Sequence, residues 1–221
     1  APTLDLDLTL SVEPAGESRP VGEPSEALIG SPFDSYTIES FLGKGGMAWV
    51  YRATHNTLYR PCAIKILTPR QRSGKDMVEL FLAEARAAAA LVHPHIVTVH
   101  NIGENSGLHY IELEYVPGQT LQQMVQAAGK LDAFPATEIL AQTCSALAEA
   151  HRCGLVHRDF KPSNVLVHRN GLAKLADFGL AKRVAAGSAT GESLAGTPYF
   201  MAPELFRSRP ASKASDVYAV G

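Results

Sequence analysis

The sequence predicts an α+β fold of two lobes: a small antiparallel β lobe that carries one helix, followed by a mainly helical lobe. Three observations predict this fold. Short runs of β-branched and aromatic residues within 36–67 are joined by short connections, which favour antiparallel neighbours. Apolar residues recur at three- and four-residue steps over 76–91, the period of an amphipathic helix. After Pro117 and Gly118 the pattern is mostly helical.

Residues 1–35 are expected to form a flexible acidic leader. Pro, Gly, Ser and Glu interrupt its apolar runs, so it cannot bury enough surface to offset the entropy lost on ordering. It holds seven acidic residues and one arginine, whereas 36–221 holds 15 acidic and 19 basic residues. The alternation over 4–10 leaves open a second interpretation, an extended peptide that docks elsewhere. The bases form no dense stripe, so no nucleic-acid partner is expected.

The β lobe is expected over residues 36–116. Strands are predicted at 36–41, 49–53 and 62–67, and a glycine turn at 43–46 separates the first two. Glycines allow backbone N–H groups to approach phosphate oxygens, although a tight hairpin without a ligand explains the turn better when it is taken alone. A helix over 76–91 follows, and then two strands at 96–102 and 108–115, with a turn at 103–107 between them.

The helical lobe is expected over residues 117–221. Its long helix is predicted at 137–152, with Thr137 as the N-cap, and a short hairpin is predicted from 165–167 and 172–175. Cys62, Cys144 and Cys153 lack CxxC spacing and are expected to be small core residues in a reducing compartment. No apolar run is long enough to predict a membrane span within this segment.

The most informative motifs are HRDFKPSN at 157–164 and DFG at 177–179. Phosphoryl transfer needs a group that orients a hydroxyl, oxygen ligands for magnesium and charge that offsets the moving phosphoryl group. In this pattern Asp159 can accept the proton of an incoming hydroxyl, and Lys161 can reach the γ-phosphate. Asn164 and Asp177 supply the hard oxygen ligands that suit Mg²⁺.

In this order, beside two short strands, the motifs resemble the catalytic and magnesium loops of the protein kinase family. Lys161 resembles the serine/threonine branch, and the alanine-rich helix with short loops resembles its bacterial, eukaryotic-like members. The resemblance covers about 36–221. It implies a protein-kinase-like fold and transfer of the ATP γ-phosphoryl group to Ser or Thr hydroxyls of proteins, including other copies of this chain. It stops within the helical lobe, which is therefore expected to be incomplete.

For the nucleotide site, the resemblance implies a set of contacts with ATP. Lys65 would hold the α- and β-phosphates and pair with Glu84, and Leu113 would be the gatekeeper. Glu114 and Val116 would meet adenine through main-chain groups of the hinge. A glycine loop would cover the phosphates and apolar walls would enclose adenine, the residues being Leu42, Gly43, Lys44, Gly45 and Gly46 for the loop and Val50, Ala63 and Leu166 for the walls. Core packing explains each apolar residue equally well when it is taken singly.

Residues 177–204 resemble an activation segment that ends in Ala-Pro-Glu. The resemblance implies that Thr197 contacts Asp159 and Lys161, and that Asp216 bonds to the backbone of the catalytic loop. We hypothesise that Arg158 binds a phosphate placed on this segment by autophosphorylation, the candidates being Ser188, Thr190 and Ser193. An unmodified polar loop is the alternative, and phosphopeptide mapping of ATP-treated protein distinguishes the two.

Two other functions stay open from the sequence. One is a kinase-like binding module without transfer, and the other is a small-molecule phosphotransferase of related fold. A binding module has no need of all five intact polar residues, which are Lys65, Glu84, Asp159, Asn164 and Asp177, so they argue against the first. GTPYFMAPE at 196–204 argues against the second because it suits a peptide substrate. We expect a cytoplasmic protein, or the cytosolic part of a longer one.

Overall fold

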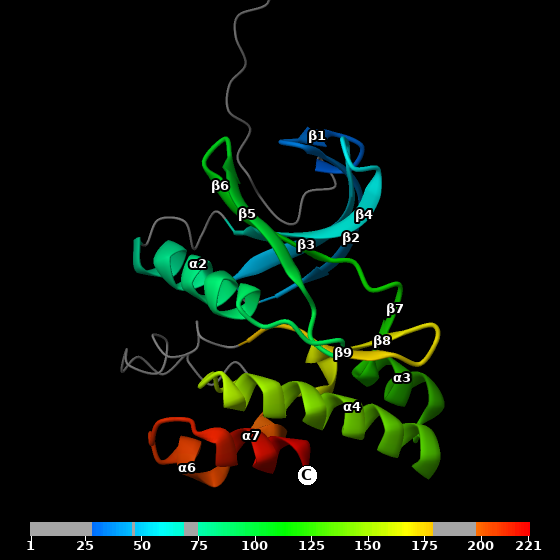
Figure 1. The fold of residues 1–221 in the computed structure, drawn as a ribbon, viewed down its shortest axis with the longest axis vertical. Coiled ribbons are helices and arrows are strands. Elements are labelled where there is room, and N and C mark those ends of the chain that lie inside the picture. The colour runs from blue at the N-terminus through cyan, green and yellow to red at the C-terminus, as the bar shows by residue number, and fades with distance from the viewer. Residues whose placement is uncertain (1–27, 46, 69–74, 179–197) are drawn as a thin grey trace, which may run out of the picture.

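The computed structural model describes residues 28–45, 47–68, 75–178 and 198–221. These residues form two lobes, with a curled sheet and one helix above and a mainly helical part below (Figure 1). The expected α+β architecture is therefore confirmed. The flexible leader stays a prediction for residues 1–27, which lie outside the described part of the chain. For residues 28–35 the expectation was wrong, because Pro32 and Phe33 pair with β2 and the Phe33 side chain is buried in the core of the upper sheet.

The upper lobe is built on a six-stranded antiparallel sheet of order β1-β2-β3-β4-β6-β5. Its strands are β1 (Pro32–Phe33), β2 (Tyr36–Lys44), β3 (Ala48–His55), β4 (Arg60–Leu67), β5 (Val99–Asn105) and β6 (Leu108–Glu114). Because side chains alternate along each strand, one face forms its own core, made of residues that include Phe33, Tyr36, Ile38, Trp49, Tyr51, Ile64 and Tyr110. The opposite face is the inner face of the sheet, which α2 covers in part, and it carries Val50 directly across from Lys65, and Arg52 across from Ala63.

Helix α2 (Lys75–Ala89) packs against the sheet through its apolar stripe. Phe81 is fully buried there with Ala85, against residues of the sheet that include Ile111. Burial of a phenylalanine side chain contributes about 2–3 kcal/mol. The helix expected over 76–91 is confirmed with slightly different ends, and its docking fixes the position of Glu84 relative to β4.

The strand expected at 96–102 begins and ends later in the structure. The strand begins at Val99 and continues to Asn105, so the turn is confined to Ser106 and Gly107. Ile96 instead forms a parallel bridge with Leu175 of the lower lobe, while the Val97 N–H donates to the Leu175 carbonyl over 2.9 Å. Residues 96 and 97 therefore pair with the backbone of the lower lobe and not with the upper sheet. Local propensity does not encode such long-range pairing.

A second sheet, of order β7-β8-β9, lies at the top of the lower lobe, where the two lobes meet (Figure 1), and consists of β7 (Gly118–Thr120), β8 (Val165–His168) and β9 (Ala173–Leu175). The hairpin of β8 and β9 is confirmed. Strand β7 was not expected, because Pro117 and Gly118 predicted only a break. A Cβ added to Gly118 would lie 1.9 Å from the Val167 carbonyl oxygen, so only glycine permits this close pairing.

The substitution Gly118→Ala is expected to destabilise the protein by about 2–4 kcal/mol, because the backbone of β8 must shift to admit the methyl group. Urea denaturation measures this loss. Gly43→Ala is the matched control, since an added Cβ there meets nothing within 4 Å and should change stability by less than about 0.5 kcal/mol. Equal denaturation midpoints for the two variants would contradict the prediction.

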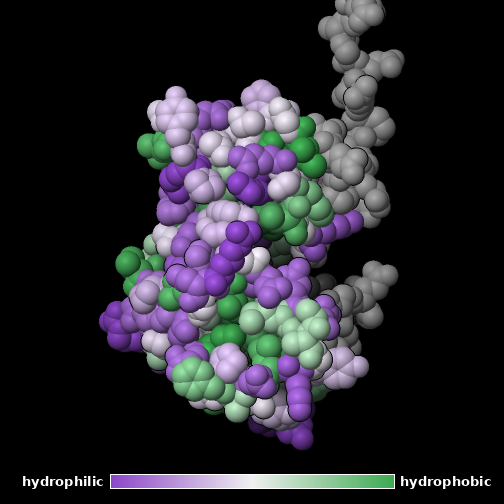
Figure 2. Space-filling view, turned by 90° about the vertical axis from the view of Figure 1, so that its right-hand side faces the viewer, coloured by the Kyte–Doolittle hydropathy of each residue, from purple (hydrophilic) through white to green (hydrophobic). Residues whose placement is uncertain are grey.

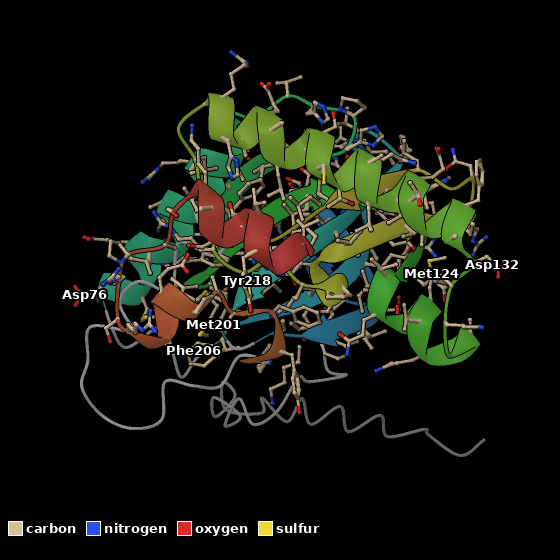
Figure 3. The ribbon with its side chains drawn as sticks, turned by 90° about the horizontal axis from the view of Figure 1, so that it is seen from below. Asp76, Met124, Asp132, Met201, Phe206 and Tyr218 are labelled. Atoms are coloured by element: carbon tan, nitrogen blue, oxygen red, sulfur yellow. The ribbon has the colours of Figure 1, made fainter. Side chains whose placement is uncertain are left out.

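The lower lobe contains α3 (Leu121–Ala128), α4 (Ala133–Arg152), α6 (Pro203–Phe206) and α7 (Lys213–Val220), with short 3₁₀ turns at Pro162–Asn164 and Pro198–Phe200. Thr120 and Gln123 form a capping box at the start of α3. The expected N-cap of the long helix was wrong: α4 begins at Ala133, and the Thr137 hydroxyl donates to the Ala133 carbonyl inside its first turns. Seen from below, α7 lies beside α4 (Figure 3).

The three cysteines do not share one environment. Cys62 is buried in β4, where burial raises the pKa of its thiol to about 12, whereas Cys144 and Cys153 are exposed on and just after α4. The expectation of core positions was therefore wrong for these two, because their side of α4 faces outward. Within the described ranges, no helix has both the length and the apolar character needed to cross a membrane.

Candidate functional site

Lys65 joins three segments that lie far apart in the sequence. Its Nζ lies 2.8 Å from Asp177 Oδ1 and 3.4 Å from Glu84 Oε1. Lys65 and Glu84 are buried, whereas the Asp177 side chain, just after β9, is 46% exposed. Burial alone would lower the pKa of Lys65, but the two carboxylates outweigh it and raise that pKa above its ordinary value. Lys65 in turn lowers the pKa of Asp177, so both groups are charged at neutral pH.

The loop between α4 and β8 brings together Asp159, Lys161 and Asn164. Lys161 Nζ lies 3.0 Å from Asp159 Oδ2. Asn164 Nδ2 donates to the main-chain carbonyl of Asp159 over 2.8 Å, which turns the amide oxygen the other way. The Ala176 N–H donates to the Asn164 carbonyl over 2.9 Å, so this loop is tied to the segment that carries Asp177.

Asp216 holds this loop from below. Its carboxylate is almost fully buried and accepts the backbone N–H groups of His157 and Arg158, both over 2.8 Å. Arg158 has a φ of 70°, an uncommon backbone conformation that the two bonds help to hold. The expected bond from Asp216 to the loop backbone is confirmed. The contact of His151 Nε2 with Asp216 Oδ2 at 2.7 Å was missed, because the end of a helix gives no local signal for it.

His157 is fully buried and packs between Phe160 and Phe178. Its Nδ1 accepts the Asp159 N–H over 3.3 Å, and its Nε2 lies 3.1 Å from the Ala176 carbonyl, which assigns the hydrogen to Nε2 of a neutral ring. Burial lowers the pKa of His157 despite Asp216 and two further carboxylates nearby. The ring therefore supports the loop by packing and hydrogen bonding.

Stability is expected to fall on acidification from pH 7.5 to 5.5. The unfolded chain protonates His157 near the ordinary pKa of about 6.5, whereas the folded protein binds that proton only at lower pH. The contribution is therefore complete above about pH 7 and is lost progressively as the pH falls below about 6.5 toward the lower pKa of the folded protein. The lowered pKa values of His93 and His100 act in the same direction. Urea midpoints across this range measure the effect, and His157→Asn should flatten it. Stability that rises on acidification would exclude this account.

The apolar residues expected around adenine are divided between the two sheets. Val50 shares the inner face of the sheet with Lys65, and Ala63 lies across from Leu113. Leu166 lies on β8 of the second sheet. A small cavity is lined by Leu113 and Lys65, by residues of α2 and by the segment after β9. Its walls include Glu84, Ala85, Ala88, Asp177 and Phe178. Val50, Ala63, Val116 and Leu166 do not line that cavity, so their adenine-binding role stays a prediction.

The glycine loop joins β2 and β3. Gly43 and Lys44 pair with Val50 and Trp49, and the Gly45 N–H donates to the Ala48 carbonyl over 2.8 Å. Leu42 is half-exposed at 47%. Gly46 lies outside the described residues, as do Gly179 and the expected activation-segment residues Ser188, Thr190, Ser193 and Thr197.

The side chain of Glu114 has a role that sequence reasoning missed. Its oxygens both lie 2.9 Å from Lys174 Nζ on β9, and one also accepts the Thr98 N–H over 3.2 Å. The end of β6 is thereby bound to the lower lobe. Figure 2, which faces the side of β7, shows mostly hydrophilic residues where the lobes meet. The only sequence signal was the opposite charge of two residues 60 positions apart.

Beyond the catalytic loop, Asp159 and Lys161 face a pocket whose other walls include Phe200, Met201 and Leu205. Met201 and Phe206 are labelled beside α7 in Figure 3. Glu204 at the start of α6 accepts the Ser215 hydroxyl over 2.6 Å, which lowers the pKa of its carboxyl. This bond joins α7 to α6, the helix that carries Leu205 of the pocket wall.

The chain was compared with known proteins. The family model described as "Protein kinase domain" matches residues 36–221. Serine/threonine-protein kinase PrkC of Bacillus subtilis is 40% identical over 84% of this chain and 29% of its own length, and PknA of Mycobacterium tuberculosis is 40% identical over 84% and 44%. The chain thus spans less than half of these curated relatives.

A crystal structure of the PknI kinase domain of M. tuberculosis aligns with a TM-score of 0.68 and 31% identity, over 86% of this chain and 73% of that one. The two-lobed architecture agrees with these matches. This chain belongs to the protein kinase domain family.

Proposed function

We propose that this chain is the catalytic part of an ATP-dependent protein serine/threonine kinase. The observation that carries the proposal is the network in which Lys65 binds both Glu84 and Asp177. A buried lysine between two carboxylates is preorganised to meet a polyphosphate at the side where Asp177 is exposed. The relatives named as serine/threonine-protein kinases support the same activity.

Nucleotide binding is assigned to the inner face of the sheet and the hinge. Lys65 binds the α- and β-phosphates, with Glu84 fixing its position. The main-chain groups of Glu114 and Val116 bind the adenine edge. The loop residues Leu42, Gly43, Lys44, Gly45 and Gly46 cover the phosphates, and Val50, Ala63 and Leu166 enclose the ring.

Transfer is assigned to the catalytic loop. Asp159 orients the acceptor hydroxyl and takes its proton, and Lys161, 3.0 Å from that carboxylate, offsets charge on the γ-phosphoryl group. Both groups border the pocket that Phe200 and Met201 complete, which gives an acceptor side chain access to them. The acceptor is a Ser or Thr hydroxyl of a protein, and a second copy of the chain is one such substrate.

Asn164 and Asp177 are the residues that would hold Mg²⁺. Their amide and carboxylate oxygens are hard donors of the kind this ion prefers, and the Asn164 nitrogen is already bound to the Asp159 carbonyl. Within the described residues, no group of three or more His, Cys, Asp or Glu side chains is arranged to hold a metal. Phosphate oxygens of ATP would be further ligands of the ion. Bound there, the ion would offset negative charge on the phosphates.

Transfer of labelled γ-phosphate to a generic basic protein tests the proposal. It is measured with this chain and with the longest natural form that contains it, with and without Mg²⁺. Label that requires Mg²⁺ and disappears in Asp159→Asn supports the kinase assignment and allows phosphopeptide mapping of Ser188, Thr190, Ser193 and Thr197. Nucleotide binding without any transfer in the longest form would favour a binding module instead.

The use of ATP as co-substrate and the three free cysteines favour the cytoplasm as the compartment of this chain.

A further inference from the structure

We infer that Arg52 is a positioning residue for the nucleotide, because its guanidinium clamps the hinge tyrosine, Tyr115. The inference rests on the proposed function, in which the hinge main chain binds adenine. Arg52 itself does not belong to the set of residues assigned above. It acts through Tyr115, and the class of ligand that it affects is an adenine nucleotide.

The clamp is defined by two contacts of one side chain. Arg52 Cζ lies 5.1 Å from the centroid of the Tyr115 ring, within the range of a cation–π interaction. On its other side, Arg52 Nε lies 2.7 Å from Glu39 Oε2. The Arg52 side chain is 44% exposed, so it lies at the rim of the sheet with its stem on the inner face beside Val50 and across from Ala63. The guanidinium is thus held between a carboxylate and an aromatic ring.

A β-bulge in β2 directs the Glu39 side chain toward Arg52. The register of β2 with β3 shifts between Ile38 and Ser40, so Glu39 is the extra residue of a β-bulge. Bulges redirect a side chain from the regular alternation of a strand. The other carboxylate oxygen of Glu39, Oε1, accepts a hydrogen bond from the Thr54 hydroxyl, so both oxygens have a partner. Thr54 and Arg52 therefore orient Glu39 from the same strand, β3.

Tyr115 lies between the two hinge residues that are expected to meet adenine, Glu114 and Val116. A side chain held at this position restricts the main chain on both sides of it. Glu114 is held from the lower lobe by Lys174, whereas Arg52 reaches Tyr115 from strand β3 of the upper lobe. The hinge is therefore bound to both lobes by cations, and Arg52 supplies the contact from the upper one. Removing it leaves the adenine-binding main chain less ordered before the nucleotide arrives.

Titration calorimetry with Mg²⁺-ADP and steady-state kinetics with ATP test the inference. Arg52→Met keeps the apolar stem and removes the cation, and we expect nucleotide affinity to fall by about three- to tenfold. KM for ATP should rise by the same factor with kcat within about twofold, because the interaction does not touch the reacting atoms. Tyr115→Leu should give a similar loss, and the double variant should lose little more than either single one.

Arg152→Met is the matched control, since Arg152 is also an exposed arginine that pairs with a glutamate, Glu149, over 2.7 Å, but on α4. It should leave affinity unchanged. Arg52→Lys keeps the charge and loses the planar stack, and an intermediate affinity supports the clamp. Wild-type affinity in Arg52→Met, or fully additive losses in the double variant, would overturn the role inferred for Arg52 and leave the proposed function standing. Failure of the unmodified protein to bind Mg²⁺-ADP would remove the proposed function and the inference with it.

Discussion

Replacement of Asp159 by asparagine is expected to reduce phosphoryl transfer by about 10²–10⁴-fold, the contribution typical of a general base. Asparagine keeps the shape of the side chain but cannot take the proton of an acceptor hydroxyl. The ion pair with Lys161 at 3.0 Å is lost as well, which weakens the placement of that ammonium group. Binding of ATP should change little, because Lys65 and its carboxylate partners lie on other segments.

The measurement is the initial rate of γ-phosphate transfer to a basic protein, with ATP affinity determined separately by calorimetry. Asp132→Asn is the matched control. Asp132 lies at the start of α4, whereas the catalytic loop follows the end of that helix, and its side chain makes no capping hydrogen bond. We expect wild-type rates from it. A rate in Asp159→Asn within tenfold of wild type would refute the assigned role of Asp159.

Sequence reasoning succeeded where the chemistry is local. The motifs at 157–164 and 177–179 place four polar residues on two loops that flank a short hairpin, and the structure has that hairpin as β8 and β9. The helix that carries Glu84 was predicted from its apolar period alone. Each of these inferences needs only residues that are close in the chain.

The predictions that failed depend on partners far away in sequence. Strand β7 exists because Gly118 lets the backbone approach Val167, about 50 residues later. Ile96 is drawn out of the expected strand by its bridge to Leu175. For the same reason the contacts of Lys174 with Glu114 and of Arg52 with Tyr115 were not foreseen. Register and packing between elements decide such contacts, and no local pattern reports them.

Asp216 is the second residue whose replacement should have a large effect. Asp216→Ala removes the acceptor of two buried backbone N–H groups, those of His157 and Arg158, and the partner of His151. A buried donor left without a partner costs about 1–3 kcal/mol. We expect a loss of about 2–5 kcal/mol in the free energy of unfolding, measured by urea denaturation. Transfer should fall too, because the left-handed backbone at Arg158 is no longer held and Asp159 follows directly.

Hydrogen exchange separates this local effect from general unfolding. In Asp216→Ala, the amides of His157 and Arg158 should exchange faster by a larger factor than those of β3, which lies in the other lobe. Ser215→Ala is the matched control on α7: it removes the bond to Glu204 and leaves the loop amides paired with Asp216. Equal acceleration throughout the protein would mean that Asp216 acts only through global stability. Acceleration confined to the loop would mean that α7 determines the backbone conformation on which the position of Asp159 depends.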